Sequence, residues 1–248
     1  MQIIGPRATL LGWLRDLWRF RGVLVALCVR DIRAKYKQAL LGVAWAVIQP
    51  ACQVGIFTLV FKGVANVATP VPYPVFILAS LLPFNLFQQI VGFGTPAFVA
   101  SQGIVTKVYF PRLYTVLAGS ASSFVNSLIS MVLLGGLLVV YEVPVGLRIL
   151  LAVPMLMATT LLAVGIAALL GALNARFRDV QHALPLLMTV VMYVSPVLYP
   201  LDAVPRSVRT VAIFNPISGL VEGFRYAVTG AEPFSWTLVG FGVITAGV

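Results

Sequence analysis

Residues 113 to 140 read LYTVLAGSASSFVNSLISMVLLGGLLVV, an apolar run without a single Asp, Glu, Lys or Arg. A bilayer core of about 30 Å needs about 20 apolar residues per helix, so this run is long enough to cross it. Five further apolar runs follow the same pattern, at approximately 39 to 61, 74 to 94, 149 to 173, 184 to 199 and 234 to 248. Loops that carry Pro, Gly or charge separate them. The pattern predicts an all-α integral membrane protein whose transmembrane domain, residues 39 to 248, has six helices.

The composition also indicates that lipid is the solvent. Hydrophobic residues make up 60% of the 248 positions and charged residues 10%, which excludes a water-soluble domain with a polar surface. Cys28 and Cys52 lie in a basic stretch and an apolar run, so we expect both to be reduced. The last run ends about 13 residues after Trp236, too short to cross a bilayer, and we expect that the C-terminus is truncated.

The net charge of +10 is explained by its distribution along the chain. If the N-terminus is cytoplasmic, twelve of the 17 basic and three of the 7 acidic residues lie inside, a net charge of +9. The outside then carries the other five basic and four acidic residues, a net charge of +1. This is the positive-inside rule. It predicts a multi-pass membrane protein with a cytoplasmic N-terminus, and it leaves no role for nucleic acid.

The N-terminal segment, residues 1 to 38, alternates apolar and basic residues, with apolar positions grouped on helical faces. This is typical of an interfacial helix whose apolar side dips into the lipid while cations stay at the headgroups. The residues expected to hold it there are Arg30, Arg33, Lys35, Tyr36 and Lys37. A membrane-proximal cytoplasmic helix with no special role is the alternative.

Several kinds of chemistry are missing from the sequence. No ionisable residue lies near the middle of an apolar run, which weighs against a proton- or sodium-coupled transporter. The one histidine, His182, has no second His and no Cys beside it, so no metal site is expected. No serine has a candidate base, and no catalytic residue is assigned. The chain lacks a G-x-x-x-x-G-K-[ST] loop, so any ATPase is a separate polypeptide.

The first apolar run contains a file of polar and aromatic residues in steps of four. The file consists of Trp45, Gln49, Gln53 and Phe57. The second run also combines aromatic and amide residues: Phe84, Asn85, Phe87, Gln88 and Gln89. Amides in hydrocarbon are costly unless they meet a partner or a wet cavity. Such residues suit a carbohydrate ligand, because aromatic faces stack on sugar C–H groups and amides bond hydroxyls; helix packing contacts are the alternative.

Two connections between the runs have a helical character of their own. Residues 101 to 112, SQGIVTKVYFPR, form a short amphipathic and basic stretch between two membrane helices, which suits docking to a soluble partner. The outer segment from 200 to 233 contains apolar pieces, 211 to 217 and 220 to 226, that are too short to span the bilayer. We expect re-entrant helices there.

Four motifs together resemble the permease subunit of polysaccharide ABC exporters, the family that moves lipid-linked O-antigens, capsules and teichoic acids. They are KVYFPR at 107 to 112, NARFRD at 174 to 179, SPVLYP at 195 to 200, and Asn215 with Pro216. The similarity runs from about Asp31 to Gly230. It implies the type-2 ABC exporter permease fold, with an interface helix, a coupling helix and re-entrant helices.

The resemblance also implies a homodimer of permeases with two ATPase subunits, which would bind the ATP and Mg, so this chain itself needs no cofactor. The coupling contacts would be Lys107, Tyr109, Phe110 and Arg112 in the first cytoplasmic loop, and Arg176, Arg178 and Asp179 in the second. An aromatic dimer channel is implied for the file at 45 to 57, with Phe84, Phe87, Gln88, Tyr193 and Tyr199. We interpret the chain as the permease of a lipid-linked polysaccharide exporter in the inner (plasma) membrane, with O-antigen as the first choice of substrate. The alternatives are an exporter of capsule, teichoic acid, drug or plain lipid, or a flippase or glycan-processing enzyme without ATP.

The charge distribution can be tested by labelling. Single cysteines introduced at Ser101 and Ser207 should react with a membrane-impermeant thiol reagent from opposite sides, because +9 of the net charge is assigned to the cytoplasmic side. Labelling of both positions from outside the cell would contradict the topology.

Overall fold

A computed structural model describes residues 21–36, 44–100, 113–203, 206–231 and 235–247. Within these ranges the chain forms helices and short connections, and no strand. This confirms the all-α expectation. The bounds are α2 (Arg21–Tyr36), α3 (Trp45–Phe57), η2 (Thr58–Val64), α4 (Tyr73–Ala100), α6 (Leu113–Val140), η3 (Leu147–Leu151), α7 (Ala152–Arg176), α8 (Val180–Val194), η4 (Leu201–Ala203), α9 (Arg206–Ile213), α10 (Pro216–Thr229) and α11 (Trp236–Gly247).

Four helical segments are long and apolar enough to cross a membrane: Trp45–Val64, Tyr73–Ala97, Tyr114–Val140 and Leu147–Arg176. Two further apolar helices, Val180–Val194 and Trp236–Gly247, are shorter. At 1.5 Å per residue α8 is about 22 Å long, less than a bilayer core of about 30 Å. The multi-pass prediction is therefore supported by four candidate spans within the described residues, while the count of six stays a prediction.

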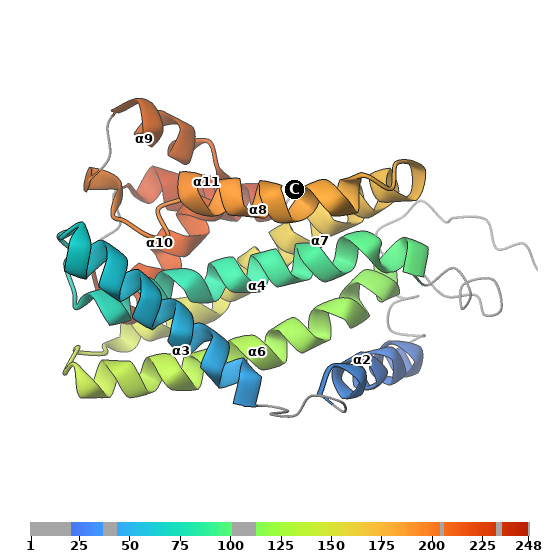
Figure 1. The fold of residues 1–248 in the computed structure, drawn as a ribbon, viewed down its shortest axis with the longest axis horizontal. Coiled ribbons are helices and arrows are strands. Elements are labelled where there is room, and N and C mark those ends of the chain that lie inside the picture. The colour runs from blue at the N-terminus through green and yellow to red at the C-terminus, as the bar shows by residue number, and fades with distance from the viewer. Residues whose placement is uncertain (1–20, 37–43, 101–112, 204–205, 232–234, 248) are drawn as a thin grey trace, which may run out of the picture.

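Helix α4 lies at the centre of the bundle, with α3, α6, α7, α8 and α10 around it (Figure 1). Of its most apolar 18-residue window, 78% is buried, against 11% for the segment that contains α3. Its crossing with α7 is close, because a Cβ on Gly94 would lie 2.7 Å from the Cβ of Ala167. Small residues at such crossings let helices in a membrane gain van der Waals contact. The core of the protein is thus built on α4.

Helix α10 falls in the segment where re-entrant helices were expected. Asn215 caps its N-terminus by accepting a hydrogen bond from the Ile217 backbone N–H, Pro216 occupies the first turn, and Gly230 ends it at φ 73°. It packs against α4, α7 and α11. The contact with α11 is tight, since a Cβ on Gly219 would lie 2.1 Å from the Leu238 carbonyl oxygen. Its helical form is established, and its re-entrant course stays a prediction.

Two of the sequence motifs meet where α10 joins the bundle. The Asn215 side-chain N–H donates to Ser195 Oγ at 2.9 Å, which connects the start of α10 to the end of α8. In the same SPVLYP stretch the Leu198 carbonyl accepts a hydrogen bond from Tyr73 Oη at 2.8 Å. These motif residues therefore hold three segments together and are structural in this fold.

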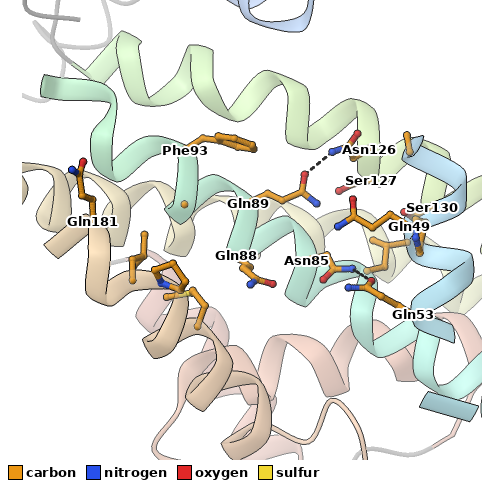
Figure 2. Close-up of a pocket in the computed structure, with 17 residues that line it drawn as sticks. Gln49, Gln53, Asn85, Gln88, Gln89, Phe93, Asn126, Ser127, Ser130 and Gln181 are labelled. Atoms are coloured by element: carbon orange, nitrogen blue, oxygen red, sulfur yellow. Dashed lines mark hydrogen bonds between the residues drawn. The ribbon is translucent and has the colours of Figure 1, made fainter. Parts of the chain in front are cut away.

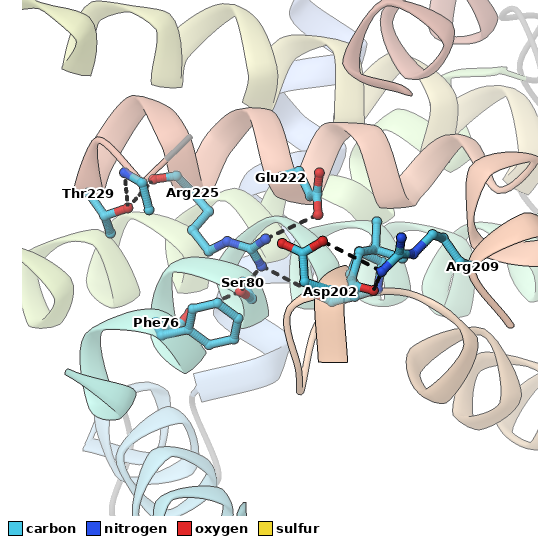
Figure 3. Close-up of polar contacts among 10 residues, drawn as sticks. Phe76, Ser80, Asp202, Arg209, Glu222, Arg225 and Thr229 are labelled. Atoms are coloured by element: carbon cyan, nitrogen blue, oxygen red, sulfur yellow. Dashed lines mark hydrogen bonds and ion pairs between the residues drawn. The ribbon is translucent and has the colours of Figure 1, made fainter. Parts of the chain in front are cut away.

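An ion pair buried in α10 escaped the sequence analysis, which placed both residues in an outer loop. Arg225 donates to Glu222 at 3.3 Å, to Ser80 Oγ at 3.2 Å and to the Pro196 carbonyl at 3.0 Å (Figure 3). Its guanidinium carbon lies 4.4 Å from the centre of the Phe76 ring. The Arg225 and Glu222 side chains are only 6% and 1% exposed. A buried charge is tolerated when it is paired and hydrogen-bonded, as here.

This cluster predicts a strong asymmetry between single and double substitutions. Glu222→Met should lower the free energy of unfolding by about 3 to 5 kcal/mol, because it leaves the Arg225 guanidinium buried without its carboxylate. The double variant Glu222→Met/Arg225→Met should cost less than the single one. Thermal melts of the purified protein in detergent measure both.

The exposed ion pair between Arg209 and Asp202 provides the control. Its charged atoms are 3.5 Å apart, and the Asp202 side chain is 79% exposed. Asp202→Asn should change stability by less than about 1 kcal/mol. If the double variant at 222 and 225 had a lower melting temperature than Glu222→Met, the unpaired Arg225 charge would not be the cause of the lost stability.

Candidate functional site

A cavity of about 440 Å³ opens between α3, α4, α6 and α8. Polar side chains from all four helices surround it (Figure 2). The lining residues are Ala46, Gln49, Pro50, Gln53, Leu82, Asn85, Gln88, Gln89, Gly92, Phe93, Asn126, Ser127, Ser130, Gln181, Leu184, Pro185 and Met188. This volume falls in the range of ligand sites in proteins, about 300 to 1,000 Å³.

Helix periodicity places the amides of α4 on the cavity side. Asn85, Gln88 and Gln89 are spaced three and four residues apart, so they share one face of the helix. Phe84 and Phe87 do not line the cavity and are buried in the core, 0% and 4% exposed. The aromatic and amide residues of the second run, which the sequence analysis treated as one surface, are therefore divided between core and cavity.

Two amide pairs connect the helices around the cavity. The Asn85 side-chain N–H donates to the Gln53 amide oxygen at 3.0 Å and connects α4 to α3. The Asn126 side-chain N–H donates to the Gln89 amide oxygen at 2.6 Å and connects α6 to α4. A primary amide offers two N–H donors and two lone pairs, and each of these bonds uses only one. Gln53 and Asn85 therefore retain hydrogen-bonding capacity toward the cavity.

The cavity has the chemistry of a site for neutral polar groups. Gln49 and Gln88 line it and, within the described part of the chain, have no hydrogen-bond partner. None of the described lining residues carries a formal charge. Leu82, Leu184 and Met188 supply an apolar wall. Amides beside an apolar wall can bind hydroxyl groups through exchangeable hydrogen bonds without fixing a counter-ion.

The structure brings together some of the predicted channel residues and separates others. Gln49, Gln53 and Gln88 line one cavity. Trp45 begins α3 and is 52% exposed, but does not line it. Phe57 is half-buried against the core, 6.2 Å from the Phe61 ring.

The two predicted tyrosines lie near each other beyond the cavity. Tyr193 is 53% exposed at the end of α8. Tyr199 is half-buried and its hydroxyl donates to the Tyr193 carbonyl. Neither lines the cavity. A role for them in a channel stays a prediction.

The predicted coupling residues lie at the connection between α7 and α8. Arg176, Arg178 and Asp179 are exposed there, at the end of the bundle opposite η2. Asn174, in the same motif, is fully buried, and its side-chain oxygen accepts the Gln181 backbone N–H at 3.2 Å. That contact fixes where α8 begins. Lys107, Tyr109, Phe110 and Arg112 lie outside the described residues.

The basic residues of the predicted interface helix are only partly described. Arg30 and Arg33 are exposed on α2, which packs against α6. The side chains of Lys35 and Tyr36, and the whole of Lys37, lie outside the described residues. The helix itself is confirmed over Arg21–Tyr36, and its position at the membrane surface stays a prediction.

Sequence reasoning missed Asn126 and Gln181 as cavity residues. Asn126 is a single amide within the long apolar run at 113 to 140, next to Ser127, and both line the cavity. An amide in such a run needs a partner, and this was the available signal. Gln181 gave no signal, because it lies among charged residues at a helix start.

Stability measurements can distinguish a wet cavity from a packing contact. Gln88→Leu should change the free energy of unfolding by less than about 1 kcal/mol, because water replaces what the amide loses. Phe84→Ala, which empties a site in the core, should cost about 3 to 5 kcal/mol. A loss for Gln88→Leu as large as that for Phe84→Ala, in the same detergent melt, would mean that Gln88 is a buried packing contact.

Comparison with known proteins identifies the family. The ABC-2 type transporter family matches residues 23 to 229. The O-antigen export system permease protein RfbA of Myxococcus xanthus is 30% identical, with 88% of this chain and 86% of the relative covered. RfbA of Klebsiella pneumoniae is 26% identical, with 87% and 81% covered. The polysialic acid transport protein KpsM of Escherichia coli is 26% identical, with 82% and 80% covered. The chain belongs to the ABC-2 type transporter family.

Proposed function

We propose that this chain is the membrane-spanning permease subunit of an ATP-driven transporter that exports a lipid-linked polysaccharide, O-antigen in the first instance, across the inner membrane. The observation that carries the proposal is the cavity in which four helices of an ABC-2 family member present uncharged amides. The names of the relatives support the choice of substrate, because two of them are O-antigen export permeases. Because another relative is named a polysialic acid transport protein, a capsule polysaccharide is the second candidate for the exported substrate.

The chemistry of the cavity suits a moving polymer. A glycan presents many similar hydroxyls, and Gln49, Gln53 and Gln88 can bind them one after another with bonds that are individually weak, about 1 kcal/mol each. A charged side chain would hold the polymer more firmly at one position along the path. None lies among the described lining residues. Repeated weak contacts therefore favour sliding over trapping.

The proposed path includes Gln49, Gln53 and Gln88, with the exposed aromatic residues Trp45 and Tyr193. It leaves out Phe84 and Phe87, since their burial gives a polymer no surface to contact. A second copy of the chain would close the open side of the path. Exposed apolar residues on α8, among them Leu186 and Val190, suit such a contact.

Energy would come from two separate ATPase subunits, which would bind ATP and Mg. Their contact would involve the exposed Arg176, Arg178 and Asp179 together with residues 101 to 112. A cytoplasmic N-terminus is part of this proposal, because it places that end of the bundle on the side where ATP is available. The buried Asn174, which fixes the start of α8, would couple movement at that loop to the helix that lines the cavity.

An export assay tests the path directly. The double variant Gln49→Leu/Gln88→Leu should slow polysaccharide export at least tenfold while insertion, association with the ATPase and basal ATP hydrolysis stay near normal, because neither amide bonds another helix among the described residues. The reason is that both amides lose their hydrogen bonds to the polymer while the core is untouched. The control is Thr189→Val on α8, because Thr189 is exposed and does not line the cavity. Normal export by the double variant, measured as surface polysaccharide, would exclude the cavity as the path.

A further inference from the structure

A second hollow, of about 630 Å³, lies on the outside of the bundle and is lined almost entirely by apolar groups. It runs between the end of α3 with η2, the start of α4 and the end of α6. The residues that line it are Ala51, Val54, Gly55, Thr58, Leu59, Lys62, Gly63, Pro74, Leu133, Leu137 and Tyr141. We call it the lysine groove, because Lys62 is the one charged side chain among these residues.

The lysine groove is separate from the amide cavity. Successive residues of an α-helix differ by about 100° around its axis, so Ala51 and Gly55 lie on nearly the opposite side of α3 from Gln49 and Gln53. The two hollows have no lining residue in common. The lysine groove contains none of the amides that suit a glycan. Its ligand should therefore be an apolar chain with an anionic end.

The backbone beside the groove has an unusual form. Residues Thr58–Val64 form a π-helix, in which the Ala65 N–H donates to the Val60 carbonyl at 2.9 Å, five residues back. π-helical turns are rare and occur frequently at functional sites. In this wide turn the Phe61 ring stacks on Tyr73 at a centroid distance of 6.4 Å, while Lys62 next to it is exposed. The turn thus packs the partly buried Phe61 ring against the core and leaves Lys62 exposed at the groove.

The walls of the groove have room for a chain. A Cβ added at Gly55 or at Gly63 would meet nothing within 4 Å, so open space begins directly at the backbone of both residues. Leu59 is 68% exposed beside them. In a membrane this space is filled by lipid, since water is excluded from the hydrocarbon region.

The charge at the end of the groove is positive. Lys62 is exposed and lines the groove, and a lysine at a helix end in a membrane extends its ammonium to the headgroup level. The nearby Glu142 does not line this groove. It lines a neighbouring hollow with Pro70–Pro72 and Thr229–Ala231, and Tyr141 lies between the two.

We propose that the lysine groove binds one phospholipid of the surrounding bilayer, with an acyl chain along Gly55 and Leu137 and an anionic headgroup at Lys62. Basic residues near the membrane surface attract anionic lipid headgroups electrostatically. The proposal concerns a lipid that stays bound to the permease. It is independent of which polymer passes through the amide cavity.

Native mass spectrometry of the purified full chain in detergent tests it, with palmitoyl-oleoyl phosphatidylglycerol and palmitoyl-oleoyl phosphatidylcholine as probes. The chain should retain one phosphatidylglycerol more tightly than phosphatidylcholine. Lys62→Gln should weaken phosphatidylglycerol retention about fivefold, to the level of phosphatidylcholine, and Lys62→Arg should preserve it. Gly55→Leu should reduce retention of both lipids, because the new side chain occupies the groove.

Gly165→Leu is the matched control, since Gly165 is exposed on α7, has equally open space at its Cβ position and lines neither hollow. Equal retention of the two lipids by the unmodified chain, or unchanged retention in Lys62→Gln, would overturn the headgroup contact. Tighter retention of undecaprenyl phosphate than of phosphatidylglycerol would overturn the choice of a bilayer phospholipid and assign the groove to a carrier lipid. An effect of Gly55→Leu on dimerisation without an effect on lipid would assign it to a second copy of the chain. Export is not a readout here, so a failure of the phospholipid proposal leaves the proposed export function standing.

Discussion

The burial of α4 at the centre of the bundle is the constraint on which the rest of the structure depends. Helices in lipid gain little from hydrophobic association, so they are held by close packing and by polar contacts between them. Helix α4 provides both kinds. Gly94 allows the close crossing with α7, Ser80 accepts a hydrogen bond from Arg225 of α10, and Asn85 and Gln89 connect to α3 and α6. These packing and hydrogen-bond contacts with α4 therefore set the positions of the neighbouring helices.

Polar groups in this bundle occur in two different environments, and the difference separates structure from proposed function. Around Arg225 the polar groups are buried and paired, with Glu222, Ser80 and the Pro196 carbonyl all bonded to one guanidinium. Around Gln88 the cavity is open, and the amides keep unused donors and acceptors. A cluster with several bonds to one group fixes one geometry, because any movement breaks several bonds. A cavity lined by amides with unused donors and acceptors allows partners to exchange.

The motifs behind the resemblance have mainly structural roles in the described residues. The Asn215 amide donates to Ser195 Oγ, and the Asn174 amide oxygen accepts the Gln181 N–H. Both asparagines fix the ends of helices that follow loops. Their neighbours Arg176, Arg178 and Asp179 remain exposed and available for a partner. The motifs thus identify the family through residues that set loop geometry, while the amides of the cavity lie outside all four motifs.

The sequence by itself determined the class of the protein and its apolar helices, and it singled out five amides that the structure places around one cavity: Gln49, Gln53, Asn85, Gln88 and Gln89. It could do so because burying a polar group in lipid is costly at every position. This cost determines which residue types occur in the membrane helices and how the polar ones are spaced. Only the tertiary structure decided that Phe84 and Phe87 are core residues, that Asn126 and Gln181 join the cavity, and that Glu222 and Arg225 pair inside the bundle. Periodicity groups the residues of one helix by face. Which face meets a neighbour depends on contacts between segments far apart in the chain, such as Ser80 with Arg225, and those contacts have no local signal.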